Sequence, residues 1–139
     1  MREGASVARL TDRMRQFLDE PRYGVLATIN GDGSPQQTVM WFTREGDTIM
    51  MNTLRGRKKD RNIARDGRAS LCVEEGTTYL TLSGTIAFEG DVEQGRADIA
   101  KLARRYVGPD AGAEFAGQER VTLRLTVDKV DAHGFEDEG

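Results

Sequence analysis

The chain has few of the residues on which protein-borne chemistry usually depends. Among its 139 residues it has one cysteine, Cys72, and one histidine, His133. A single cysteine cannot form an intramolecular disulfide, and the pair lacks the usual spacings of a zinc site. Nothing in the local sequence joins the two residues as a Cys–His nucleophile. We expect Cys72, which lies in an apolar run, to be a buried thiol. A protein metal site and a nucleophilic hydrolase are therefore not expected.

Long apolar runs are also missing. No segment approaches the roughly 18–20 residues that a membrane-spanning helix needs, and the charged N-terminal segment has no hydrophobic stretch typical of a signal peptide. With 37% hydrophobic and 31% charged residues, the composition is that of a folded soluble protein. We expect a single domain over residues 1–139, a cytoplasmic location and no membrane partner.

Short segments with alternating apolar and polar residues dominate the chain and predict strands. The predicted strands cover residues 23–29, 36–43, 48–53, 68–74, 79–89 and 121–127, with an extension of the last to residue 130 left open. A short helix is expected at about residues 10–19 with Thr11 as N-cap, two helical turns before Gly67, and a further helix at about 94–106. Gly84 predicts a bulge or bend in the longest strand. An acidic tail is expected at about residues 131–139, frayed over Glu136–Gly139.

Six short strands with two or three peripheral helices predict a mainly β fold. The short turns between consecutive strands favour antiparallel pairing, and the architecture that suits this pattern is a small six-stranded antiparallel barrel. The sequence contains neither an internal repeat nor a linker that would divide it.

Positive charge is concentrated in one short segment. Seven of the chain's 20 lysines and arginines lie between Arg55 and Arg68, although the net charge of the chain is −3. Lys58, Arg61 and Arg65 share one helical face. The segment includes the start of a predicted helix, where free backbone N–H groups and the helix dipole attract anions.

This basic segment has three interpretations. It is a solvated helix face, a nucleic-acid surface or a site for a discrete phosphate-bearing ligand. A nucleic-acid surface is disfavoured because the rest of the chain is acidic and no aromatic residues interleave with the basic ones. A Walker loop and a dinucleotide glycine fingerprint are absent, so a phosphate would be held by side chains and the helix start. The residues alone leave the first and third interpretations open.

Four segments, taken in order and spacing, carry a resemblance to a known family. They are residues 24–29 (GVLATI), 32–36 (DGSPQ), 57–63 (RKKDRNI) and 65–71 (RDGRASL). Together they resemble the pyridoxamine 5′-phosphate oxidase-like family of FMN-binding split barrels over about residues 20–130, and most of all its actinobacterial branch that uses the deazaflavin coenzyme F420. The resemblance implies a six-stranded antiparallel split β-barrel and a homodimer in which each of two cofactor sites uses both chains.

The resemblance also assigns residues to the site. Arg57 and Lys59 would bind the cofactor phosphate, with Lys58 and Asn62 nearby. The residues that would line the ring system lie on the second and third strands: Pro35, Gln36, Thr38, Met51, Asn52 and Thr53. Trp41 and Tyr79 are candidates for contacts that involve the partner chain, with core or dimer packing as the alternative for Trp41. Of Met50 and Met51, one must face the core.

The implied activity is hydride transfer from reduced F420 to a small electron-poor unsaturated substrate, such as an enone, a quinone or a tetrapyrrole. The cofactor carries this chemistry, which agrees with the absence of an obvious catalytic dyad, and no catalytic residue is assigned. Vitamin B6 oxidation is not expected, because residues 131–135 lack the family's pyridoxal phosphate ligands.

Two alternatives to an F420-dependent reductase remain. Arg57 and Lys59 would serve the phosphate of FMN equally well, so an FMN-dependent oxidoreductase of the same fold is one of them. A non-enzymatic carrier of a flavin, F420 or a tetrapyrrole is the other. We favour F420, because the basic segment is broader than one phosphate monoester requires and suits a phosphodiester with an oligoglutamate tail.

Overall fold

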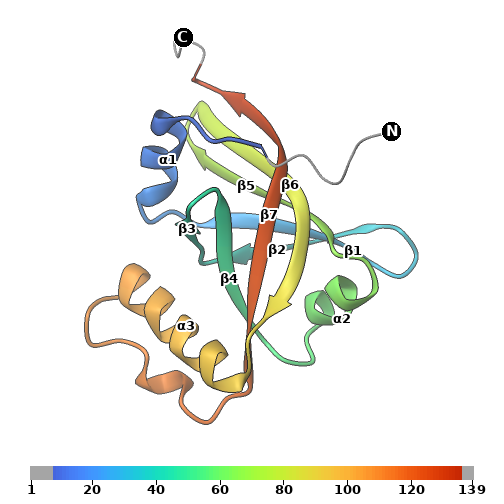
Figure 1. Cartoon of the computed structure of the whole chain (residues 1–139), viewed down its shortest axis with the longest axis vertical. Coiled ribbons are helices and arrows are strands. Elements are labelled where there is room, and N and C mark those ends of the chain that lie inside the picture. Colours follow the sequence, from blue (N-terminus) through green and yellow to red (C-terminus); the bar gives the residue numbers. More distant parts are fainter. Residues whose placement is uncertain (1–7, 136–139) are drawn as a thin grey trace.

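The computed structural model describes residues 8–135, which form one antiparallel sheet flanked by helices (Figure 1). The sheet has the order β2-β1-β5-β6-β7-β4-β3. The seven strands in this part of the chain are β1 (Gly24–Ile29), β2 (Pro35–Met40), β3 (Thr43–Glu45), β4 (Thr48–Leu54), β5 (Arg68–Glu75), β6 (Thr78–Glu89) and β7 (Arg120–His133).

The two edge strands of this sheet, β2 and β3, are neighbours along the chain. Only Trp41 and Phe42 separate them. Because so short a link keeps the two edges close together, the sheet curls into a barrel. The barrel stays open between β2 and the second half of β4, since β3 pairs only with residues 48–50 of β4. The mainly β, split-barrel prediction is therefore confirmed, with seven strands in place of six.

The additional strand arises because the predicted strand at residues 36–43 breaks at Trp41 and Phe42. The backbone N–H of Phe42 donates to the hydroxyl of Tyr106 (3.2 Å), and the carbonyl of Phe42 accepts a hydrogen bond from Arg105 Nε (3.0 Å). The side chains of Tyr106 and Arg105 thus form hydrogen bonds with the backbone groups of Phe42 that a neighbouring strand would otherwise have paired. The Phe42 ring is fully buried, which fixes the direction of the bend.

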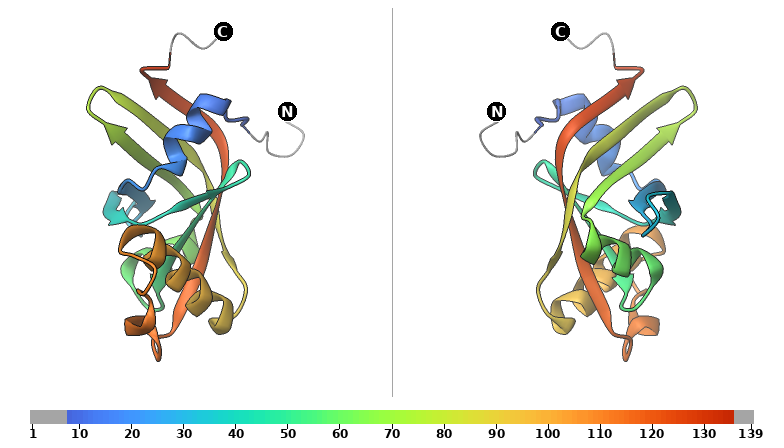
Figure 2. Two further views of the ribbon diagram at one scale, coloured as in Figure 1. Left: turned by 90° about the vertical axis from the view of Figure 1, so that its left-hand side faces the viewer. Right: turned by 90° about the vertical axis from the view of Figure 1, so that its right-hand side faces the viewer.

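Four helices are present in residues 8–135: α1 (Asp12–Asp19), α2 (Lys58–Arg65), α3 (Val92–Tyr106) and the short 3₁₀ helix η1 (Ala113–Phe115). Thr11 caps α1 as predicted, because its hydroxyl accepts a hydrogen bond from the backbone N–H of Met14 (3.1 Å). The views in Figures 1 and 2 show α1 toward the end of the sheet where β7 finishes, and α2 and α3 toward the other end. No helix within residues 8–135 is long and apolar enough to cross a membrane.

The main core fills the barrel interior with side chains from the inner face of the sheet. Fully buried members from β1 and β4 to β7 include Leu26, Met51, Leu71, Leu80, Leu82, Leu123 and Leu125. A second, smaller cluster lies under α3, where Met50 packs with Ile99 and Leu102. Because consecutive residues of a strand face opposite sides, Met51 enters the barrel core while Met50 meets α3.

A bulge shapes the long hairpin of β6 and β7. Their register shifts between Ser83 and Gly84, as the glycine predicted. A Cβ atom at Gly84 would lie 1.9 Å from the carbonyl oxygen of Thr126, so only glycine allows the two backbones to approach this closely. Beyond the bulge β7 stays paired with β6 as far as His133. Residues 131–133 of the expected acidic tail are therefore strand, whereas the expected fraying at 136–139 lies outside the described residues.

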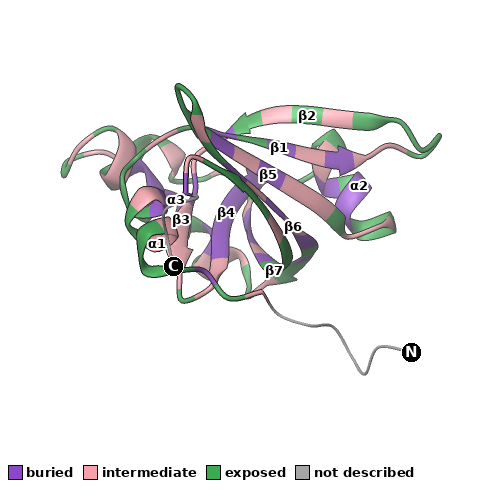
Figure 3. Cartoon of the chain, turned by 90° about the horizontal axis from the view of Figure 1, so that it is seen from above, coloured by how far each residue is buried: buried purple, intermediate pink, exposed green. Residues whose placement is uncertain are grey.

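An apolar row crosses the outer face of β2, β1 and β5. Val39 pairs with Val25, and Val25 pairs with Cys72 on its other side. Val39 is 63% exposed and Val25 36% exposed. Cys72 is half-buried, which corrects the expectation of a buried thiol, because its side chain lies on this outer face. β2 forms a rim of the sheet whose residues are mostly exposed or half-buried (Figure 3).

Candidate functional site

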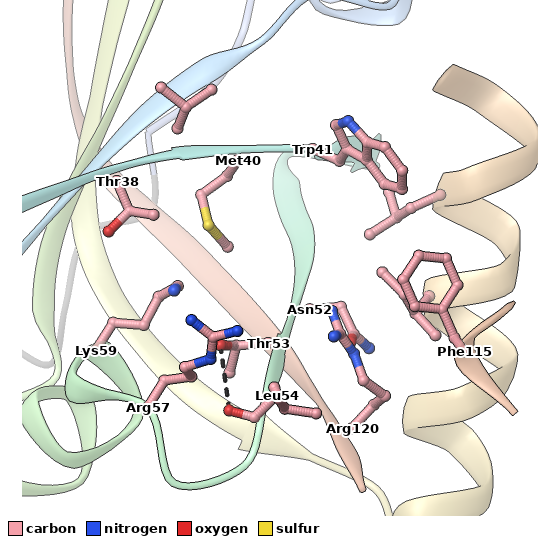
Figure 4. A pocket seen from close by; sticks show the side chains of 13 residues that line it. Thr38, Met40, Trp41, Asn52, Thr53, Leu54, Arg57, Lys59, Phe115 and Arg120 are labelled. Carbon is pink, nitrogen blue, oxygen red and sulfur yellow. Dashed lines mark hydrogen bonds between the residues drawn. The ribbon is translucent and has the colours of Figure 1, made fainter. Parts of the chain in front are cut away.

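A cavity of about 270 Å³ lies where the barrel is open, between β2, β4, the start of α2 and α3. Figure 4 shows its lining, with Arg57 and Lys59 on the α2 side and Trp41 and Phe115 on the α3 side. The complete lining is Thr38, Val39, Met40, Trp41, Asn52, Thr53, Leu54, Arg57, Lys59, Ile99, Leu102, Phe115 and Arg120.

A tight loop aims the cations of α2 at this cavity. The loop turns at Gly56, whose φ of +91° is in the range that favours glycine. Its backbone N–H donates to Asp60 Oδ2 (2.6 Å), and this hydrogen bond closes the loop against the first turn of α2. Arg57 occupies the N-cap position without making a side-chain cap, so its guanidinium extends into the cavity with the Lys59 ammonium.

Among the described residues that line the cavity, three are cations and none carries a carboxylate. Burial, followed by the nearby charges of Arg57 and Arg120, lowers the pKa of Lys59. Burial and the charge of Arg57 likewise lower the pKa of Arg120. Half-buried cations that repel each other are stabilised by bound anions, so the cavity has the electrostatics of an anion site.

Opposite these cations the cavity has an aromatic and aliphatic wall. The Trp41 ring stacks on Tyr106 with centroids 5.4 Å apart and meets Phe115 edge-on at 6.3 Å. Ile99 and Leu102 of α3 complete this wall and are buried. Because Trp41 is held from two sides, it presents a fixed flat surface, which suits a ligand with a planar ring system.

The remaining basic residues of α2 line a second hollow of about 350 Å³. Lys58, Arg61 and Arg65 share it, as expected from their position on one helical face. The basic segment is therefore divided by α2: Arg57 and Lys59 face the cavity at the opening of the barrel, whereas these three face the turn between β1 and β2.

Asn62 lines the second hollow and is buried. Its Nδ2 donates to Thr28 Oγ1 (3.2 Å) and Asn30 Oδ1 (3.0 Å), and its Oδ1 accepts from Arg65 Nη2 (3.1 Å). Only 1% of the residue is exposed. These contacts fasten α2 to β1, so the geometry gives Asn62 a positioning role toward Arg57 and Lys59.

We expect the Asn62→Ala variant to lose about 1–3 kcal/mol of unfolding free energy, because its hydrogen bonds to Thr28 and Asn30, which fasten α2 to the sheet, are lost. Urea unfolding measures this loss. Lys58→Ala is the matched control, since Lys58 is exposed on the same helix, and its stability should stay near that of the parent. Unchanged stability of Asn62→Ala would contradict the positioning role.

The cavity brings together half of the residues that the sequence predicted for the site: Thr38, Trp41, Asn52, Thr53, Arg57 and Lys59. That these residues bind a cofactor stays a prediction. Lys58 and Asn62 line the second hollow. Gln36 joins the network of Asn62, since its Oε1 accepts a hydrogen bond from Thr28 Oγ1 (3.1 Å).

Three predicted residues lie away from both hollows. Pro35 is exposed at the start of β2, and the side chain of Met51 is buried in the barrel core. Tyr79 stacks on His133 with centroids 5.3 Å apart, where β6 begins and β7 ends.

The sequence interpretation missed Met40 and the contributions of α3, η1 and β7. Met40 carries a usable signal, because it shares a strand face with Thr38 two residues earlier. Arg120 carries none by itself. It reaches the cavity only because β7 pairs with β4, which sets Arg120 opposite Leu54.

Comparison with known proteins identifies the family of this chain. The sequence pattern described as pyridoxamine 5′-phosphate oxidase matches residues 10–134. The chain belongs to this family. It is 28% identical over 127 residues to the F420H(2)-dependent biliverdin reductase of Mycobacterium tuberculosis (strain CDC 1551 / Oshkosh), a match that covers 90% of this family member and 89% of the relative.

Solved structures share the fold of this family member. An F420 reductase superposes with a TM-score of 0.74 at 27% identity, over 94% of this chain and 98% of that one. The conserved hypothetical protein Rv2991 from Mycobacterium tuberculosis superposes with a TM-score of 0.78 at 23% identity, over 96% and 89% of the two chains. The second likeness is one of fold alone.

Proposed function

We propose that this protein is an F420-dependent oxidoreductase that reduces a small electron-poor unsaturated substrate. The observation that carries the proposal is one cavity with the cations of Arg57 and Lys59 on one side and a fixed aromatic wall on the other. The two cations suit the phosphate of a deazaflavin coenzyme, and the wall suits a flat molecule that stacks beside the ring system of the coenzyme. The named activities of the two relatives, an F420H(2)-dependent biliverdin reductase and an F420 reductase, support the proposal. A tetrapyrrole is therefore one candidate substrate.

The residues of this chain would act by binding and orientation. Arg57 and Lys59, with the start of α2, hold the phosphate. Thr38 and Thr53 offer hydroxyl groups, and Met40 an apolar surface, along the floor of the cavity. Trp41, Leu102 and Phe115 exclude water from the face where the substrate approaches. The chemistry that bound reduced F420 would supply is hydride transfer to the double bond of the substrate, for which solvent would supply the proton.

A homodimer with cofactor sites at the subunit boundary belongs to the same proposal. At about 270 Å³, the cavity is below the roughly 300–1,000 Å³ typical of small-molecule sites, as expected if a second chain supplies a further wall. The apolar row on the outer face of the sheet beside this opening has Val39 and Val25 exposed and Cys72 half-buried. Burial of such a row against a second copy removes apolar surface from water.

Sedimentation velocity with added F420 tests both parts in one experiment. Detection at the visible absorbance band of F420 should find the cofactor moving with a species of about twice the 15.4 kDa chain mass. Addition of FMN in place of F420 is the matched comparison. Co-sedimentation of FMN alone would favour the FMN-dependent alternative. If F420 co-sediments but a separate activity assay finds no turnover of enones, quinones or biliverdin, a carrier is favoured.

A further inference from the structure

Arg120 is the cation of the cavity that the proposed phosphate site leaves unused. It begins β7 and enters from the side opposite α2, whereas Arg57 and Lys59 come from the start of α2 (Figure 4). Those two side chains and the helix N-terminus form one group of anion donors. A phosphate held by that group leaves the charge of Arg120 without a counterion.

Among the residues that the structure describes, only neutral groups hold the guanidinium of Arg120 in place. Its Nε donates to Asn52 Oδ1 (2.9 Å) and its Nη1 donates to Gln118 Oε1 (3.1 Å). Asn52 is itself fixed, because its Nδ2 donates to the carbonyl of Gly95 (2.8 Å). Within residues 8–135 no acceptor is found for Nη2. The side chain is therefore fixed in position while its charge stays available.

Arg120 also belongs to the apolar wall. Its guanidinium carbon lies 5.3 Å from the ring centre of Phe115, and Phe115 meets Trp41 edge-on. A flat conjugated molecule on this wall would therefore have an anionic substituent within reach of Arg120. Guanidinium binds both carboxylate and phosphate groups strongly, and the N–H groups that Arg120 has left, on Nη2 and Nη1, can form two parallel hydrogen bonds to a carboxylate.

We propose that Arg120 binds a carboxylate of the substrate, and hence that the substrate class is an electron-poor conjugated acid. This inference rests on the proposed function, because it assigns the phosphate of the cofactor to Arg57 and Lys59. It makes Arg120 a residue that determines specificity, and it predicts a preference for the acid form of a substrate over its ester.

The test uses Trp41, the only tryptophan of the chain, as a fluorescent reporter inside the cavity. Protein saturated with oxidised F420 is titrated with biliverdin, which carries two propionate carboxylates, and with its dimethyl ester. The parent protein should bind the acid about 10-fold or more tightly than the ester, as expected for a charge-assisted contact. In Arg120→Gln the ratio should fall to within about threefold of one, while affinity for F420 stays within about threefold of the parent value.

Two further variants keep the result interpretable. Arg55→Gln is the matched control, because Arg55 pairs with Glu119 and lines neither hollow, so its acid preference should be that of the parent. Arg120→Lys keeps the charge but loses the planar fork, so its acid-to-ester affinity ratio should be intermediate. This variant still tests the inference if Arg120→Gln fails to fold.

The outcomes separate this inference from the function on which it rests. An unchanged acid preference in both Arg120 variants overturns the inference, as does a parent protein that binds neither probe or binds both equally. Loss of F420 affinity in Arg120→Gln with an unchanged acid-to-ester ratio overturns it too, because Arg120 would then belong to the cofactor site. Failure of the parent protein to bind F420 refutes the proposed function itself.

Discussion

Replacement of Arg57 and Lys59 together by alanine is expected to weaken F420 binding by at least about 10-fold, since each charge-assisted contact to an anion contributes roughly 1.5–3 kcal/mol. Titration followed by F420 fluorescence measures the loss. The free protein should not be destabilised. The pKa of Lys59 is lowered in the folded chain by burial and by Arg57 and Arg120, so its positive charge opposes folding at neutral pH. Removal of the charges should leave stability equal or slightly higher.

A matched control removes the same charge from the same segment without altering the cavity. Arg55 and Arg68 pair with Glu119 and Asp66 and line neither hollow, so the Arg55→Ala/Arg68→Ala variant should bind F420 nearly as the parent does. Equal losses in the two double variants would mean that only the general positive charge of the segment matters. Unchanged affinity in Arg57→Ala/Lys59→Ala would refute the assignment of the phosphate site.

Substitution of alanine for Gly84 is expected to cost about 3 kcal/mol or more of unfolding free energy. The new Cβ would lie 1.9 Å from the carbonyl oxygen of Thr126, and backbone cannot move aside as a flexible side chain can. The β6–β7 pairing would have to open at the bulge, next to Ile86 and Val127 of the main core. Urea unfolding followed by circular dichroism measures the change.

Gly31→Ala is the control for this prediction. A Cβ atom at Gly31 would meet the guanidinium carbon of Arg65 at 3.6 Å, an ordinary contact distance, and Gly31 does not have a positive φ. Its unfolding free energy should change by less than about 1 kcal/mol. Similar stabilities for the two variants would show that β6 and β7 can separate at the bulge at little cost.

Most of the secondary structure follows from local patterns in the sequence. The alternation along β6, the glycine at its bulge and the Thr11 cap of α1 are all features of a few neighbouring residues. The break at Trp41 and Phe42 is not, because it depends on Tyr106 and Arg105, which are about 60 residues away along the chain. The length of β7 was underestimated for a related reason: polar residues near its end stay in the strand because β6 pairs with them.

The site divides in the same way. Arg57 and Lys59 could be identified because they belong to a concentrated charge pattern next to a helix start. Asn62 was assigned to the neighbourhood of the phosphate, but its hydrogen-bonding capacity is used by Thr28, Asn30 and Arg65. Arg120 and Phe115 reach the cavity through strand pairing and through the loop after α3. No sequence window contains both these residues and the cations of α2.

The unpaired gap between β2 and β4 has a mechanical consequence. Within residues 8–135 no backbone ladder joins β2 to β4. A bound molecule that touches Thr38 on β2 and Thr53 on β4 would connect the two strands. Binding of such a molecule favours by mass action the state in which the two sides of the gap are held together. It would slow local opening most where the backbone ladder is missing. Amide hydrogens of β2 would then exchange more slowly when ligand is present, while those in the middle of β6 would change little. The ligand would link β2 and β4 at the position where the barrel has no pairing strand.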